Sequence, residues 1–64
     1  MKTGIVKFYH EMKGYGFIKD DATGKDIFVH SSGLQDHIRI GDKVTYEVTE
    51  GPKGPMATNV KKVR

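Results

Sequence analysis

The segment KGYGFIKDDATGKDIFVH, residues 13–30, decides the fold of this chain. Its two runs at 15–19 and 26–30 are rich in β-branched and aromatic residues, which is typical of strands. The polar, glycine-bearing stretch between them is typical of a hairpin turn. The three large aromatic residues Tyr15, Phe17 and Phe28 could form the core or lie on the surface, and the alternation of side chains along a strand separates these arrangements.

This alternation favours aromatic residues on the surface. If they pointed inward, Lys19, Asp26 and His30 would share the interior with them, and burial of an unpaired charge is costly. In the opposite arrangement the aliphatic residues face inward and the charges are solvated. We therefore expect a core of Ile18, Ile27 and Val29, joined by Val6, Val44, Tyr46, Val48, Val60 or Val63 and closed at the barrel end by Leu34, Ile38 and Ile40.

Three further strands are predicted over 3–10, 43–48 and 56–63. The segment 50–55, with two prolines and two glycines, is interpreted as a loop, and the connection 31–42 as holding one helical turn over 34–37. Five short strands joined by short loops predict an all-β, five-stranded antiparallel barrel, closed so that no strand edge is exposed. The pattern leaves open whether this is an oligonucleotide-binding or an SH3-like barrel.

The composition sets limits on partners. The chain has 64 residues, enough for a single domain spanning 1–64, and a net charge of +3, which permits an anionic partner. It has no cysteine, no apolar run of the ~20 residues that span a membrane, and no signal-peptide pattern in MKTGIVKF. We expect a soluble cytoplasmic protein without a membrane partner, a small-molecule substrate or a cofactor.

Exposed aromatic residues on adjacent strands suggest two functions. With lysines around them they form a platform on which bases stack, while the phosphates meet the lysines. Alternatively, the patch docks a peptide, as in a small SH3-like interaction module. The structural alternative is that the rings only pack on one another or under a loop.

Two motifs resemble those of a known family. KGYGFI, 13–18, and DIFVH, 26–30, resemble the two ribonucleoprotein motifs of the cold-shock domain, and GIVKFY, EGPKGP and A-x-N-V follow the same pattern from Lys2 to Val63. The resemblance implies a barrel of the oligonucleotide-binding (OB) fold that binds single-stranded RNA and DNA. It also implies an RNA chaperone that prevents or melts secondary structure and so aids transcription and translation, in cold adaptation.

The resemblance also implies which residues bind nucleic acid. Lysines at three positions match phosphate-side or loop cations, aromatic residues and a histidine match stacking positions, and one carboxylate matches a base-edge acceptor. The predicted interface comprises Lys7, Phe8, Lys13, Tyr15, Phe17, Asp26, Phe28, His30, Ser31, His37, Lys53 and Pro55.

The chain departs from the family pattern in three places. Phe8 stands where tryptophan is usual, and Ser31 where many members carry a further phenylalanine. The connection 31–42 is shorter than in the best-known bacterial members of the family and lacks its usual aromatic residue, for which His37 is the nearest candidate. Tyr9 is expected to turn inward, which requires a bulge because Phe8 shares parity with the core residue Val6.

Other chemistry has little support in the sequence. The three histidines match no common metal-ligand spacing, and His10 is interpreted as a solvated strand end. No combination of residues suggests catalysis, so we expect no enzymatic activity. We expect a monomer, with a strand-swapped dimer as the alternative because the connection 31–42 is short.

Overall fold

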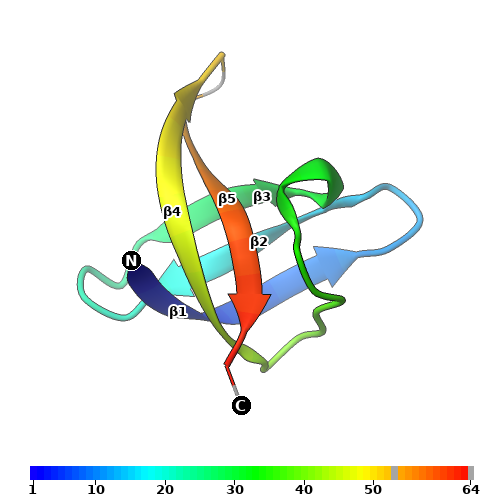
Figure 1. Cartoon of the computed structure of the whole chain (residues 1–64), viewed down its shortest axis with the longest axis horizontal. Coiled ribbons are helices and arrows are strands. Elements are labelled where there is room, and N and C mark those ends of the chain that lie inside the picture. The colour runs from blue at the N-terminus through cyan, green and yellow to red at the C-terminus, as the bar shows by residue number, and fades with distance from the viewer. Residues whose placement is uncertain (53, 64) are drawn as a thin grey trace.

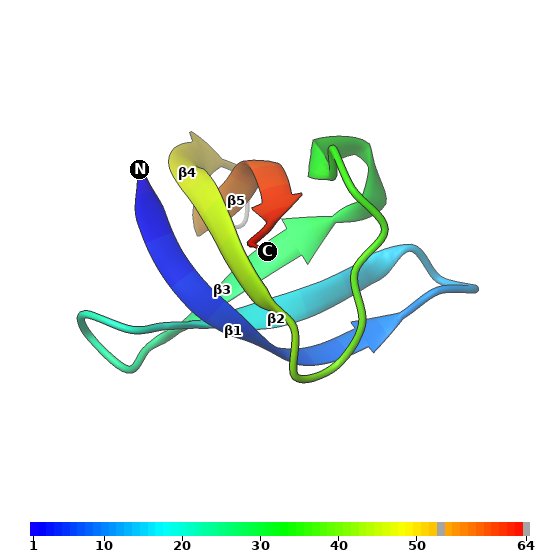
Figure 2. The same cartoon turned by 60° about the horizontal axis from the view of Figure 1, so that its bottom comes forward.

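The computed structural model describes residues 1–52 and 54–63 and contains five strands and one short 3₁₀ turn. The strands are β1 (Lys2–His10), β2 (Tyr15–Asp20), β3 (Asp26–His30), β4 (Lys43–Gly51) and β5 (Gly54–Lys62). They form a closed barrel in the order β1-β2-β3-β5-β4. β1, β2 and β3 run side by side in one layer, which β4 and β5 cross steeply (Figures 1 and 2). The predicted closed five-stranded barrel is thus confirmed.

One strand pair differs from the expected antiparallel pattern. β1–β2, β2–β3, β1–β4 and β4–β5 are antiparallel, but β3 and β5 are parallel, with Phe28 opposite Met56 and Val29 opposite Ala57. A tight hairpin forces its strands to be antiparallel, whereas β3 and β5 are separated by β4 and the long connection before it. No hairpin therefore sets their relative direction, and this pair closes the barrel.

The core lies inside the barrel, on the face that the strand parity predicts. It consists of Val6, Ile18, Val29, Ile38, Val44, Tyr46, Ala57 and Val60, with Tyr9, Ile27, Leu34 and Val48 partly buried against it. Ile40 and Val63 were expected in the core, and both expectations are wrong, since their side chains are 65 % and 41 % exposed. Ile40 begins the turn that leads toward β4, and Val63 follows the last residue of β5, so both lie beyond the barrel end.

A bulge in β1 turns Tyr9 inward as predicted. The register between β1 and β2 shifts between Val6 and Phe8, which leaves Lys7 as the extra residue. Tyr9 then packs against the core, whereas Phe8 is exposed. Tyr9 lies opposite Gly16, where a Cβ atom would clash with the Phe8 carbonyl oxygen, so a side chain there would force the two strands apart.

The two irregular segments differ in detail from the sequence predictions. The helical turn, η1, covers Ser31–Gly33 instead of 34–37, and Leu34 then forms an isolated parallel bridge with Val60. Most of 50–55 belongs to the β4–β5 ladder, with Glu50 paired to Pro55, so interpreting the whole segment as a loop is wrong. Pro55 is tolerated there because it is the second residue of β5, next to the terminal Gly51–Gly54 pair, where the missing N–H interrupts the ladder only at its end. Within the described residues, no helix is long and apolar enough to cross a bilayer.

One buried carboxylate stabilises the turn between β2 and β3. Asp20 is 3 % exposed, and its Oδ2 accepts a hydrogen bond of 2.9 Å from the Thr23 hydroxyl. This hydrogen bond holds the pKa of Asp20 below its ordinary value, against the opposite effect of burial. The buried hydroxyl of Tyr46 is nearby but forms no hydrogen bond within the described residues. Burial and this carboxylate raise the pKa of Tyr46.

Candidate nucleic-acid interface

Five rings from three neighbouring strands form a continuous row on the outside of the barrel. We call this set the aromatic row: Phe8, His10, Tyr15, Phe17 and Phe28. The Tyr15 and Phe28 rings stack with centroids 6.2 Å apart, and Phe17 meets Phe28 edge to face at 5.9 Å. Direct pairing of Phe17 with Phe28 across β2 and β3 brings these rings together. The surface position predicted from parity is thus confirmed, although Tyr15, Phe17 and Phe28 are half-buried by their mutual contacts.

Phe8 extends the row across β1. Its ring is 38 % exposed and lies 6.1 Å from the Tyr15 ring, edge to face. Without the bulge at Lys7, Phe8 would share the inward parity of Val6. The bulge therefore places both Tyr9 in the core and Phe8 in the row.

His10 is a member of the row that the sequence analysis missed. Its ring lies nearly parallel to that of Tyr15, at 7° and 6.4 Å between centroids, and it is half-buried instead of fully solvated. Its Nδ1 accepts a hydrogen bond of 3.3 Å from the Lys13 backbone N–H, which leaves the proton on Nε2. The alternation of side chains could have predicted this position, because His10 follows Phe8 by two residues in the same strand and therefore points to the same face.

His30 and Ser31 lie at the end of β3. The Nδ1 of His30 accepts a hydrogen bond of 3.2 Å from the Ser32 backbone N–H and caps η1. The side chain of His30 is exposed. The backbone N–H of Ser31 donates to the Gly14 carbonyl at 2.8 Å, which places it beside the β1–β2 turn. Because the side chain of Ser31 is only a small hydroxyl group, this residue adds no ring to the aromatic row.

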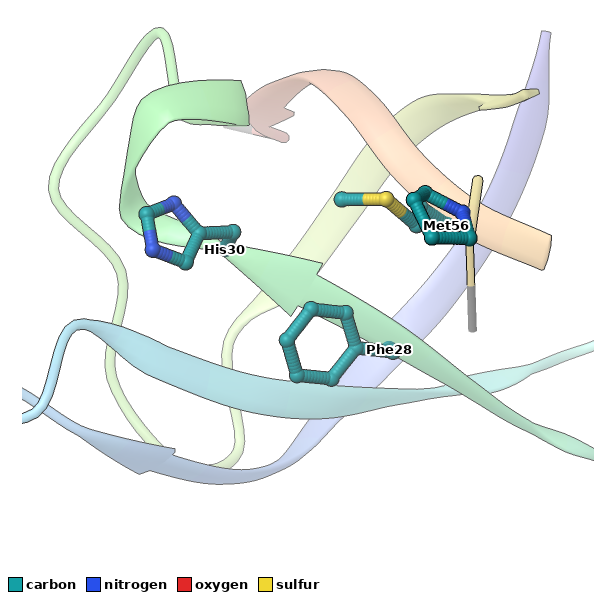
Figure 3. Close-up of a pocket in the computed structure, with 4 residues that line it drawn as sticks. Phe28, His30 and Met56 are labelled. Atoms are coloured by element: carbon teal, nitrogen blue, oxygen red, sulfur yellow. The ribbon is translucent and has the colours of Figure 1, made fainter. Parts of the chain in front are cut away.

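A notch of about 240 Å³ opens next to the row, between β3 and β5. Among the described residues its walls are Phe28, His30, Pro52 and Met56 (Figure 3). This volume is below the ~300–1,000 Å³ of sites that enclose a drug-sized ligand. Met56 and Pro52 were not among the predicted site residues. Pro55, which was predicted, is exposed and does not line the notch, and Lys53 lies outside the described residues.

Two charged side chains of the predicted interface bind each other. The Lys7 Nζ lies 3.0 Å from the Asp26 Oδ2, and both side chains are exposed, at 59 % and 42 %. Lys13 is exposed in the β1–β2 turn. The structure thus places two of the predicted lysines around the aromatic row, one of them engaged by a carboxylate.

His37 is not brought into contact with the aromatic row. Its Nε2 lies 2.8 Å from the Glu11 Oε1, so it links the connection before β4 to the turn after β1. It makes no ring contact with the described aromatic residues. Over residues 1–52 and 54–63, no three histidine, aspartate or glutamate side chains are grouped so as to hold a metal ion.

Comparisons of the sequence agree with the resemblance in its motifs. The sequence model of the 'Cold-shock' DNA-binding domain family matches residues 2–63. Cold shock-like protein CspA of Stigmatella aurantiaca is 46 % identical over 67 residues, covering 98 % of this chain and 98 % of that protein. Cold shock-like protein CspE of Buchnera aphidicola is 46 % identical over 61 residues, covering 89 % of this chain and 88 % of that protein.

Solved structures agree with the fold. The Drosophila Unr CSD456 structure superposes with a TM-score of 0.81 at 21 % identity, covering 98 % of this chain and 26 % of that one. Apo-CusF of Escherichia coli superposes with a TM-score of 0.70 at 18 % identity, covering 98 % of this chain and 84 % of that one. At such identities the likeness shows the fold alone, and it identifies the barrel as one of the OB type instead of the SH3-like alternative.

Proposed function

This chain belongs to the family of 'Cold-shock' DNA-binding domains, and from that premise we propose that it binds single-stranded RNA and DNA through its aromatic row. The observation that carries the proposal is the row itself. It places five rings in mutual contact on one outer face, where a folded monomer gains nothing by leaving them partly exposed. Stacking on such rings contributes ~1–3 kcal/mol per base and tolerates any base, since every base has a π-face.

The lysines around the row supply the electrostatic part. Lys7 and Lys13 project from the bulge and from the turn next to it, and both are exposed. Cations at these places neutralise phosphates and release counterions, so binding should weaken as the salt concentration rises. Phosphate contacts position the strand, while the rings and the notch receive its bases.

Binding to unpaired strands gives an RNA-chaperone activity by mass action. A protein that binds the open form of a hairpin and not the paired form shifts the equilibrium toward the open form. Because cold stabilises RNA secondary structure, this effect serves transcription and translation at low temperature. We propose that the protein acts in this way in the cytoplasm and as a monomer. Size-exclusion chromatography tests the monomeric state directly.

The row is smaller than the family pattern implies. Phe8 presents less ring area than tryptophan, Ser31 supplies no ring, and His37 is engaged by Glu11 away from the row. Fewer stacked bases mean fewer contributions of ~1–3 kcal/mol each. We therefore expect lower affinity and a shorter occupied strand than in relatives that have all of these rings. Comparable affinity for oligothymidine in side-by-side titrations would contradict this.

The test of the function is a titration of tyrosine fluorescence with a short oligothymidine. Tyr15 lies within the row, so a stacked base should quench its emission. The titration is run at two salt concentrations, and it is repeated with the same strand in a duplex. We expect quenching that weakens with salt and is stronger for the single strand. Absence of quenching at low salt would overturn the proposal.

A further inference from the structure

Methionine sulfur is the group through which this chain can react with a mild oxidant. The sequence has three methionines and no cysteine, so no thiol competes for the oxidant. Met1 and Met12 are 76 % and 95 % exposed, and the described walls of the notch include neither of them. Met56 is the methionine that lies within the candidate site.

Met56 faces the notch from β5. It lies opposite Phe28 in the parallel β3–β5 pair, and its side chain is half-buried. The sulfur and terminal methyl group extend from β5 toward the His30 side of the notch (Figure 3). Gly51 leaves room for the sulfur, because a Cβ atom at Gly51 would clash with it. A small oxidant can therefore reach the thioether through the open notch.

A peroxide converts this thioether to a sulfoxide. With hydrogen peroxide, the sulfur attacks one oxygen, and an S–O bond forms as the O–O bond breaks. The other oxygen leaves as water with both peroxide hydrogens. The sulfur loses two electrons and the peroxide gains them, so the step needs no other reactant. The Met56 wall then carries a polar oxygen where it had presented only apolar atoms.

A base in the notch would cover this new oxygen. A sulfoxide oxygen accepts hydrogen bonds, and covering a polar group that has no partner is costly. The side chains of Phe28 and Pro52 hold no hydrogen-bond donor. A hydrogen bond from the His30 ring to this oxygen would itself cross the notch and exclude the base. Oxidation therefore opposes base binding at the wall that favours it in the reduced protein.

We propose that Met56 is an oxidation site through which a peroxide lowers the affinity of the protein for a single strand. The thioether supports a base in the notch, and the sulfoxide excludes it. Methionine sulfoxide reductases return the sulfoxide to the thioether, so the change is reversible. This inference rests on the proposed function and adds regulation of the same site by an oxidant.

The test measures affinity for an oligothymidine before and after treatment with hydrogen peroxide. Peptide mass spectrometry follows oxygen addition at each methionine, and circular dichroism checks that the treated protein stays folded. The wild-type chain should bind about ten-fold more weakly once Met56 is oxidised. Reduction by methionine sulfoxide reductases that act on both sulfoxide epimers should restore the affinity.

Met56→Leu and Met12→Leu are matched variants, each compared with its own untreated form. Met56→Leu keeps an apolar side chain of similar volume without the sulfur, so peroxide should not lower its affinity. Met12→Leu retains the thioether in the notch and should lose affinity as the wild-type chain does. Equal losses in the two variants, unfolding of the treated protein, or unchanged affinity after oxidation of Met56 overturns the inference.

A bound strand should in turn protect Met56. With saturating oligothymidine, oxidation of Met56 should slow relative to that of Met12, because a base in the notch covers the thioether. An unchanged ratio of the two oxidation rates would show that no base covers it and would overturn the inference. If the untreated wild-type chain binds no strand, the proposed function fails. If it binds and the oxidised protein binds equally well, only the role of Met56 fails.

Discussion

Phe28 of β3 stacks on Tyr15 of β2, with 6.2 Å between the ring centroids and 21° between the ring planes. Their neighbours in the same strands, Gly16 and Val29, are buried in the opposite direction. Two adjacent strands thus supply both the barrel interior and the outer face. Because each ring is held by the other, the face is organised before a strand arrives, which lowers the entropic cost of binding.

Phe28→Ala should weaken binding of a single strand by ~1–3 kcal/mol, since it removes a stacking ring that also forms a wall of the notch. The free energy of unfolding should fall by only about 1 kcal/mol, because the ring contacts lie outside the core. Fluorescence titration and urea denaturation measure the two effects.

Val29→Ala is the matched control for this prediction. Val29 is fully buried, so truncation leaves a cavity and should lower stability on the order of 2 kcal/mol. Binding by the fraction that remains folded should be nearly unchanged. A greater loss of stability for Phe28→Ala than for Val29→Ala would show that Phe28 serves the fold.

Phe8→Trp should strengthen binding. The Phe8 ring is 38 % exposed at the edge of the row, so a larger ring can extend outward without displacing core residues. The added stacking area should contribute up to about 1 kcal/mol per bound strand. Quenching of the new tryptophan emission measures it, and unchanged or weaker affinity would show that no base stacks at this position.

Strand parity predicted most of the fold and the identity of the central rings. Ile18 and Val29 had to face inward once Lys19 and Asp26 faced water, and this argument needs no tertiary information. It also required the bulge in β1, because Phe8 and Val6 would otherwise share a face. The alternation of side chains along a strand is sufficient to predict its buried face wherever charged and aliphatic residues fall on opposite faces.

The sequence could not predict features that depend on contacts between distant segments. The notch forms because β3 and β5 are parallel and bring Met56 opposite Phe28, and no hairpin signals that pairing. The contact between His37 and Glu11 depends on the path of the connection before β4. Likewise, Ile40 is apolar and was assigned to the core, but it falls in a turn.

Met56→Ala should weaken binding, because Met56 forms the β5 wall of the notch beside Phe28. A base in the notch would lose contact with the thioether on one side, and we expect a loss of about 1 kcal/mol. Met12→Ala is the control, since Met12 is 95 % exposed and lies in the β1–β2 turn. Equal effects of the two substitutions in the same titration would indicate that no base occupies the notch.

Asp20→Asn should destabilise the fold in a pH-dependent way. The hydrogen bond from Thr23 lowers the pKa of Asp20 in the folded chain below the ~3.9 of an unfolded aspartate. The ionised carboxylate therefore stabilises the folded state above the unfolded pKa, and this contribution is lost as the pH falls through the lowered folded pKa. The difference in free energy of unfolding between the wild-type chain and Asp20→Asn should be greatest near neutral pH. It should shrink below about pH 4.

Thr23→Val tests whether the hydrogen bond from Thr23, and not only the presence of the Asp20 carboxylate, causes this pH dependence. It removes the hydroxyl that donates to the Asp20 Oδ2 and leaves the carboxylate in place. With that donor gone, the pKa of Asp20 should rise, since burial opposes ionisation and its largest opposing effect is absent. Because the folded pKa then lies closer to the unfolded one, Thr23→Val should lose less stability than the wild-type chain between about pH 4 and pH 2 in urea denaturation. Parallel stability curves for the two proteins would show that the hydrogen bond does not set the titration of Asp20.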